Sequence, residues 1–234
     1  MSDVVLIVPG RPELRDNLMA AARNLSDLIG GARVVELAPP VLAGAAASSI
    51  AVQANASHTP DFAGEVAARG CRADFLVATQ PDATDTKFLQ LAFRAAVFRT
   101  GRPVLMMPAH YRGDFGHRVA IAWRDDARTV KALMPAMKLL GYADEVHLLA
   151  GTRAGAPTPA LPSVLLEHGI KATLHVLAIG IGPFGEQLLN RACDVSADLL
   201  IMGAHGHTRL HDILLGGVTN YVVNHTNVPV LMRN

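Results

Sequence analysis

Four glycines and a threonine near the end of the chain have the types and spacing of a phosphate-binding loop. Gly203 and Gly206 are three positions apart, and after nine further residues Gly216 and Gly217 precede Val218 and Thr219. Glycine has no Cβ, so it tolerates positive φ and lets a ligand approach the backbone closely. A helix that begins near Gly216 would also point backbone N–H groups and the positive end of its dipole at an anion.

A structural explanation of these glycines remains open at this point. They could form a tight turn from strand to helix and a contact between helices. A glycine inside a helix lowers its stability by roughly 1 kcal/mol relative to alanine. Both the phosphate-loop hypothesis and the structural explanation must therefore account for the two adjacent glycines at 216 and 217. The chain contains no GxxxxGK[ST], which excludes the P-loop.

Other groups of residues that could bind a metal or catalyse a reaction have simpler interpretations. His205, His207 and His211 cluster, but no cysteine or pair of acids lies nearby to complete a metal site. Asp125 and Asp126 are adjacent, yet they precede a predicted helix and are interpreted as caps rather than as a catalytic pair. No GxSxG motif occurs. The sequence therefore predicts no catalytic residue, no metal ligand and no enzymatic activity.

Short apolar runs alternate with amphipathic stretches along the whole chain, which is typical of successive βαβ units. Half of the residues are hydrophobic and only 5% are aromatic, a composition that suits strands buried on both faces. Strands are predicted at 4–8, 33–38, 75–79, 103–108, 119–123, 145–150, 172–178, 198–203 and 229–232. Helices are predicted over 12–31 and 126–140, and near 160–168, 184–194 and 211–225.

The chain also repeats itself. The segment "ADFLVATQPDATD" from residue 73 and the segment "ADLLIMGAHGHTR" from residue 197 begin stretches of the same pattern, each ending in a Pro-Val-Leu-Met strand. Such self-similarity predicts two tandem domains, at 1–110 and 116–234, with the boundary in 109–117. The fold class is then α/β, with an open, mostly parallel five-stranded sheet in each domain and helices on both faces.

The first copy lacks the glycines. Thr79, Asp82, Ala92 and Phe93 stand where the second copy has Gly203, Gly206, Gly216 and Gly217. Asp82 and Asp85 would repel a phosphate, so we expect no nucleotide to bind there.

The pattern G-x-x-G, nine residues, G, a small residue and Val-Thr is similar to the nucleotide-binding signature of the universal stress protein family. The second copy resembles that family over essentially its whole length, and the first copy is similar to the degenerate first half of tandem members. This resemblance implies ATP, with or without Mg²⁺, at the carboxyl ends of the strands. The binding residues that it implies are Ala122, Trp123, Arg124, Gly151, Met202, Gly203, His205, Gly206, Gly216, Gly217, Val218 and Thr219.

Two positions depart from the family pattern. Gly217 stands where Ser or Thr is usual, and Arg124 stands where an acidic residue is common. A lost hydroxyl would weaken binding by about 0.5–1.5 kcal/mol. Arg124 would either pair with a phosphate or remain solvated.

Two functional hypotheses follow. The first is a regulatory stress-response protein that binds an adenine nucleotide in its second domain and hydrolyses it slowly or not at all. The second is an interaction module of the same fold that binds no nucleotide. The resemblance also implies that the last strands of the two copies pair with each other; pairing removes an exposed edge. A homodimer remains open, and the sequence does not specify the protein partner or the stress.

The composition of the chain limits the cellular locations and the classes of binding partner that we expect. A net charge of +1 offers no basic field for nucleic acid or an anionic membrane. Cys71 and Cys193 form no CxxC pair and are expected to be buried free thiols in a reducing compartment. The first residues lack the basic start and cleavage site of a signal peptide. We therefore expect a cytoplasmic protein.

Overall fold

The computed structural model describes residues 4–37, 61–204, 206–209 and 212–234, which form an α/β structure. The strands are β1 Val4–Ile7, β2 Arg33–Glu36, β3 Phe75–Thr79, β4 Val104–Met107, β5 Arg118–Trp123, β6 Glu145–Thr152, β7 Thr173–Ala178, β8 Leu199–Gly203, β9 Gly206–Arg209, β10 Asp212–Leu215 and β11 Val230–Arg233. The α-helices are α1 Arg15–Leu28, α2 Phe62–Gly70, α3 Lys87–Arg99, α4 Ala127–Leu133, α5 Met137–Leu140, α6 Ser163–Glu167, α7 Phe184–Asp194 and α8 Gly217–His225. Two short 3-10 helices, η1 Pro12–Leu14 and η2 Met134–Ala136, precede α1 and α5.

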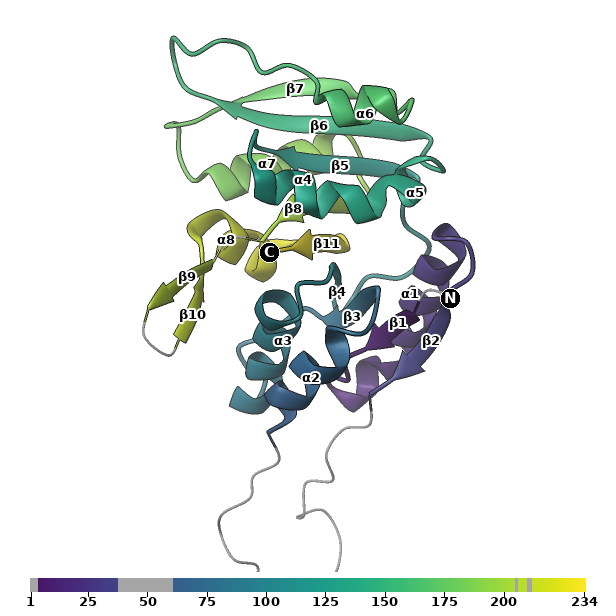
Figure 1. Ribbon diagram of the computed structural model, residues 1–234. Helices are drawn as coiled ribbons and strands as arrows, with labels where there is room; N and C mark the ends of the chain where they lie inside the picture. The colour runs from purple at the N-terminus through teal and green to yellow at the C-terminus, as the bar shows by residue number, and fades with distance from the viewer. Residues whose placement is uncertain (1–3, 38–60, 205, 210–211) are drawn as a thin grey trace, which may run out of the picture.

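Nine strands form one sheet in the order β2-β1-β3-β4-β11-β8-β5-β6-β7. Figure 1 shows the second half of the chain, from β5 onward, above the first half, which ends with β4. Neighbouring strands within each half are parallel, whereas β4 and β11 are antiparallel where the halves meet. This confirms the predicted α/β class with a mostly parallel sheet. Among the described residues, no helix is both long and apolar enough to span a bilayer.

The junction between the halves is a self-complementary pairing. Val104, Leu105 and Met106 of β4 pair in register with Met232, Leu231 and Val230 of β11. Each strand thus contributes a Val-Leu-Met tripeptide, and the two tripeptides pair antiparallel with Leu105 opposite Leu231 at the centre. These are the two strands for which pairing was predicted. The connection from β4 to β5 occupies residues 108–117.

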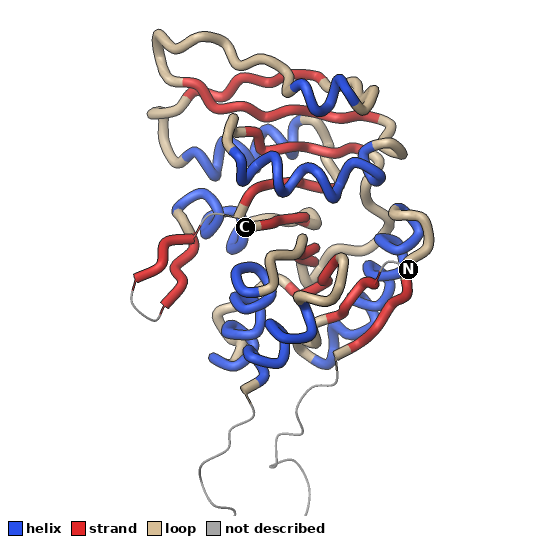
Figure 2. Tube along the Cα trace, viewed as in Figure 1, coloured by secondary structure: helices blue, strands red, loops and turns tan. Residues whose placement is uncertain are grey.

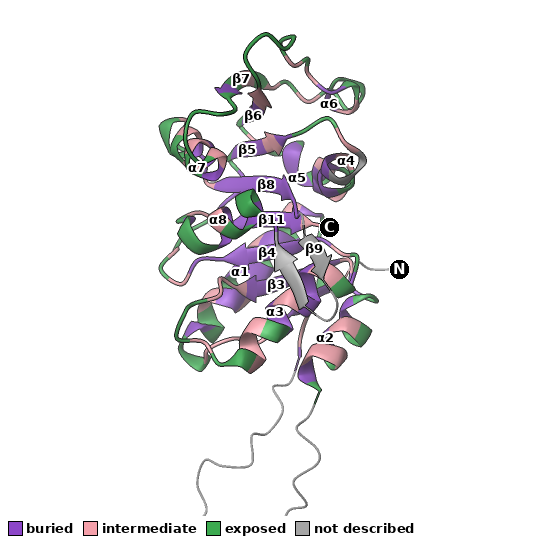
Figure 3. Cartoon of the chain, turned by 90° about the vertical axis from the view of Figure 1, so that its left-hand side faces the viewer, coloured by how far each residue is buried: buried purple, intermediate pink, exposed green. Residues whose placement is uncertain are grey.

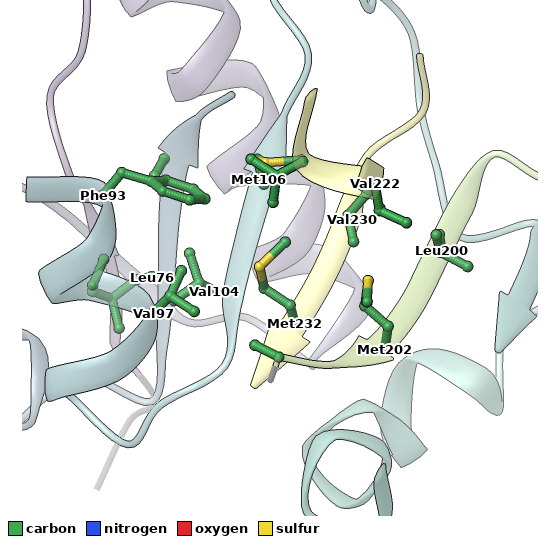
Figure 4. Close-up of a cluster of buried hydrophobic side chains, with 14 of the residues drawn as sticks. Leu76, Phe93, Val97, Val104, Met106, Leu200, Met202, Val222, Val230 and Met232 are labelled. Atoms are coloured by element: carbon green, nitrogen blue, oxygen red, sulfur yellow. The ribbon is translucent and has the colours of Figure 1, made fainter. Parts of the chain in front are cut away.

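Each face of the sheet is covered by helices from both halves. One face packs α2 and α3 of the first half and α7 and α8 of the second. The other packs α1 together with α4, α5 and α6. Figure 3 shows the strands as a buried band between these layers. In Figure 4, Met106, Val230 and Met232 continue the apolar layer across the junction, so the two halves share one core on each face.

The first half contributes four described strands, and the counterpart of β7 would fall within 38–60, outside the described residues. Two expectations need correction. Cys71 and Cys193 were expected to be buried, but both are exposed. The helix predicted near 211–225 begins only at Gly217, because residues 206–209 and 212–215 form the antiparallel strands β9 and β10. Figure 2 shows these two strands standing apart from the main sheet. A short apolar run such as Ile213–Leu215 fits a strand or a helix equally well, and periodicity alone cannot decide between them.

The junction strand predicts a large effect on stability. Leu231 is fully buried at the centre of the self-paired tripeptide. Leu231→Ala should lower the free energy of unfolding by about 2–5 kcal/mol in urea denaturation, because it leaves a cavity in a core that both halves share. Leu166→Ala, at a side chain that is 61% exposed on α6, should change it by less than about 0.5 kcal/mol. Equal effects of the two substitutions would contradict this account of the core.

Candidate functional site

The second half contains a cavity at the point where its strand order reverses. From β5 the chain proceeds to β6 and β7 on one side, and then crosses to β8 and β11 on the other. Ligands in open α/β sheets bind at such a switch point, outside the carboxyl ends of the strands. A cavity of about 460 Å³ lies there, between the ends of β5 and β8 and the start of α8. Ala122 and Met202 pair directly across β5 and β8 at its floor.

Most of the residues implied by the family resemblance line this cavity. Those in its wall are Ala122, Trp123, Arg124, Met202, Gly203, Gly216, Gly217, Val218 and Thr219. They come from three separate parts of the chain, so the fold brings together what the sequence places far apart. Gly206 begins β9, and His205 lies outside the described residues.

The start of α8 supplies the polar end of the cavity. Gly216 is the N-cap, with φ −62° and ψ 155°, and Gly217, Val218 and Thr219 form the first turn. The helix therefore begins where the phosphate-loop hypothesis requires. The first N–H groups of a helix have no carbonyl partner within that helix, and its dipole favours an anion there.

A close contact between helices fixes the direction of α8. Gly185, in the first turn of α7, faces Tyr221, and a Cβ placed on Gly185 would lie 2.7 Å from the Cβ of Tyr221. Only glycine permits this approach, because real Cβ atoms do not come so close. Gly185 thus helps to aim the first turn of α8 at the cavity.

Gly217 itself is not required by packing. It is exposed, and a Cβ added to it would meet nothing within 4 Å. The space that a serine or threonine hydroxyl would need is available. The glycine at this position therefore reflects no steric constraint within the described residues.

The opposite end of the cavity is apolar, and the sequence analysis did not identify its residues. Leu149 of β6, Ile179 after β7, and Phe184 and Leu188 of α7 line it, together with Thr129 of α4 nearer the polar end. A signal was available for Ile179, because it follows the carboxyl end of a strand that neighbours β6. Gly151, which was expected around the ribose and adenine, instead lies beneath these side chains. A Cβ there would come within 2.8 Å of Phe184 and 2.9 Å of Ile179.

A charged cluster borders the cavity at the start of α4. Asp126 caps this helix by accepting hydrogen bonds from Thr129 N (2.8 Å) and Thr129 Oγ1 (3.0 Å), and it forms an ion pair with Arg124. Partial burial acts to raise the pKa of Asp126, but the bonds from the Thr129 N–H, Arg124 and the Thr129 hydroxyl outweigh it and lower the pKa to about 2. The capping role predicted for this aspartate is confirmed.

The described lining residues of the cavity offer groups suited to binding a ligand. Among its described lining residues the polar side chains are Arg124, Thr129 and Thr219, and none is a carboxylate, an imidazole or a thiol. Backbone N–H groups and one guanidinium suit an anion at one end. Aliphatic and aromatic side chains suit a flat apolar ring at the other.

Comparison with known proteins agrees with this geometry. Residues 126–233 match the model of the universal stress protein family. The chain is 42% identical over 57 residues to a universal stress protein of Methanocaldococcus jannaschii, which is 24% of this chain and 34% of that protein. It is 37% identical over 68 residues to one of Synechocystis sp., which is 29% of this chain and 23% of that protein. The second half of this chain is therefore similar to the universal stress protein family.

The fold of the whole chain is also found in a known structure. A universal stress protein from Archaeoglobus fulgidus superimposes with a TM-score of 0.60 at 14% identity, covering 100% of this chain and 86% of that one. This likeness shows the fold alone. The chain matches well under two thirds of the length of its relatives from Methanocaldococcus jannaschii and Synechocystis sp..

In the first half the position that corresponds to the switch-point cavity is closed. Only about 10 Å³ remains between the ends of β1 and β3 and helix α3. That helix begins at Lys87, so Ala92 and Phe93 lie within it and are buried, whereas their counterparts Gly216 and Gly217 begin α8. Arg11 Nε also lies 3.4 Å from Asp85 Oδ1 beside this position. Side chains and an earlier helix start thus fill the space that glycines leave open in the second half.

The Asp126 cap predicts a pH-dependent contribution to stability. Asp126→Ala should lower the free energy of unfolding by about 1 kcal/mol at neutral pH, because the α4 N–H groups lose their acceptor. The folded pKa of about 2 lies below the ordinary value of 3.8. The contribution is therefore complete above about pH 4 and is lost as the pH falls toward 2.

Urea denaturation from pH 2 to 7 checks this expectation. The difference between the parent and Asp126→Ala should shrink across the acidic part of that range. Asp125→Ala, at the exposed neighbouring carboxylate, serves as the control and should show almost no difference. A difference for Asp126→Ala that stays constant with pH would rule out the ionised cap as its source.

Proposed function

We propose that the universal stress protein domain of this chain binds ATP in the cavity at the switch point and acts as a cytoplasmic regulatory protein of the stress response. The match to the family model supports the stress-response role. The observation that supports the ligand is the convergence of the α8 N-terminus and the ends of β5 and β8 on one cavity.

The polar end fits the phosphates. The first turn of α8 at Gly217 and Val218 offers backbone donors and the positive end of a dipole. Gly203, at the end of β8, lines the same wall without a side chain. Arg124 lies at the rim, where its guanidinium can exchange contact with Asp126 for contact with a phosphate.

The apolar end fits the base. Leu149, Ile179, Phe184 and Leu188 offer a lining for a flat ring, and the cavity volume falls within the ~300–1,000 Å³ typical of small-molecule sites. A bound nucleotide would thus place its base on the α7 side of the cavity and its phosphates on the α8 side.

Slow or absent hydrolysis follows from the side chains present. General base catalysis needs a group such as histidine, aspartate or glutamate within hydrogen-bond reach of the attacking water. The described lining residues include none of these. A bound nucleotide would therefore act as a signal rather than as a substrate.

Substitution at Gly217 separates binding from folding. Gly217→Asp places a carboxylate at the first position of α8, where it complements the helix dipole but repels a phosphate. Because the position is open, the melting temperature should stay the same or rise slightly. Calorimetric titration should show one ATP site per chain in the parent, and affinity at least about tenfold weaker in this variant, or ~1.4 kcal/mol.

Matched variants define the outcome at this position. Ser163→Asp adds a carboxylate at the exposed first position of α6 in the same half and should leave ATP affinity unchanged. Gly217→Ser adds a hydroxyl donor and should tighten binding about two- to tenfold. Unchanged affinity in Gly217→Asp, or no ATP binding by the parent protein, would refute the proposed site.

Phe184 tests the orientation of the nucleotide. Phe184→Ala removes an aromatic wall from the apolar end, so it should weaken ATP binding while leaving the affinity for inorganic tripolyphosphate nearly unchanged. Competition titrations of the two ligands measure both affinities on the same protein. An equal loss for both would show that the base does not lie against α7.

A further inference from the structure

A second and larger cavity lies where the two halves meet. Its volume is about 790 Å³, and it shares no described lining residue with the switch-point cavity. Its walls come from the segments that follow β1, β3 and β4 in the first half, and from the end of α8 with the residues after it in the second. We refer to it as the junction groove.

The position of the junction groove is that of a ligand site in this class of fold. Arg11, Gln80 and Pro108 come after the carboxyl ends of β1, β3 and β4, respectively. Ligands of open α/β sheets bind outside these ends. Because β4 and β11 are antiparallel, the carboxyl edge of the first half lies on the opposite side of the sheet from the switch-point cavity. The small closed position in the first half does not occupy this whole edge.

The charges in the junction groove favour an anion. Its lining includes Arg11, Arg112, His110 and His225, whereas Asp82 is the single carboxylate among its described lining residues. Arg11 is partly neutralised, since its Nη1 lies 3.9 Å from Asp82 Oδ2 and its Nε also contacts Asp85. Arg112 is therefore the principal cation.

Arg112 is held in place in a way that leaves part of its guanidinium available. Its Nη1 donates to the carbonyl oxygens of Ala109 (2.9 Å) and Tyr111 (2.7 Å). In the described structure these backbone bonds use Nη1, and Nη2 and Nε remain for a ligand. A guanidinium fixed in this way is pre-organised for a phosphate or carboxylate.

The wall formed by α8 is also fixed. His225 Nδ1 lies 2.8 Å from the Tyr221 carbonyl oxygen, and its ring stacks on Tyr221 with centroids 4.1 Å apart. This bond orients the imidazole and leaves Nε2 for another partner. Gln80 Nε2 donates to the carbonyl oxygens of Val223 (2.8 Å) and Thr226 (3.3 Å), so these acceptors at the negative end of the helix are already satisfied.

We propose that the junction groove binds a small organic anion that carries phosphate or carboxylate groups, with Arg112 as its principal ligand. This site is independent of the proposed ATP site, because it uses different residues on the opposite edge of the sheet. It assigns a binding role to the first half, whose own counterpart of the nucleotide cavity is closed.

Nuclear magnetic resonance titration of the full chain tests the proposal. Pyrophosphate and citrate, added separately, represent the phosphate and carboxylate forms of the ligand. Backbone amide shifts at 109–112 and 224–227 are expected for at least one probe, and the probe that binds more tightly identifies the chemical group. Shifts confined to 216–219 would mean that the anion occupies only the proposed ATP site, and would overturn the proposal.

A pair of arginine variants provides the control. Arg112→Gln should weaken the binding measured at 109–112 at least tenfold. Arg153→Gln removes the same charge from an exposed position outside the groove and should leave the binding unchanged. Equal weakening in both variants would show general charge attraction instead of a site. The absence of amide shifts at 109–112 with millimolar concentrations of either probe would also refute the proposed site.

Discussion

The antiparallel pairing of β4 with β11 is the interaction on which the rest of the structure depends. It joins two parallel sheets into one, and the apolar layer on each face continues across it. Leu105, Leu231 and their neighbours are completely buried there, so the halves cannot separate without exposing the centre of the core. The positions of both candidate sites follow from this pairing, since it decides which edge of the sheet each half presents.

Local backbone requirements then decide where a ligand can enter. In the second half, α8 begins late, after its N-cap Gly216, and presents its first turn to the cavity. In the first half the corresponding helix begins earlier, and Phe93 is buried inside it. The same arrangement of strands therefore produces an open cavity of about 460 Å³ in one half and a closed position in the other.

The sequence predicts the fold well because buried parallel strands leave a strong signal. Runs such as "VAIAW" and "DLLIM" are continuously apolar, which is the pattern of strands covered on both faces. Two adjacent glycines disfavour the interior of a helix, so the sequence also indicated a helix start near Gly216, against the helix predicted near 211–225. The strands β9 and β10 were missed because a three-residue apolar run carries no decisive period. The apolar end of the cavity was missed for another reason: Leu149, Phe184 and Leu188 resemble ordinary core residues, and only the three-dimensional arrangement turns them toward a shared space.

The self-complementary Val-Leu-Met register at the junction has a consequence for symmetry. Two identical subunits that met through such a strand would form an isologous pair, in which every substitution appears twice. Here both strands belong to one chain, so a change in one half is not copied into the other. Their association is also intramolecular and does not depend on protein concentration. A covalent link of this kind frees one half to lose a cavity and the other to keep it, while the interface between them stays symmetric.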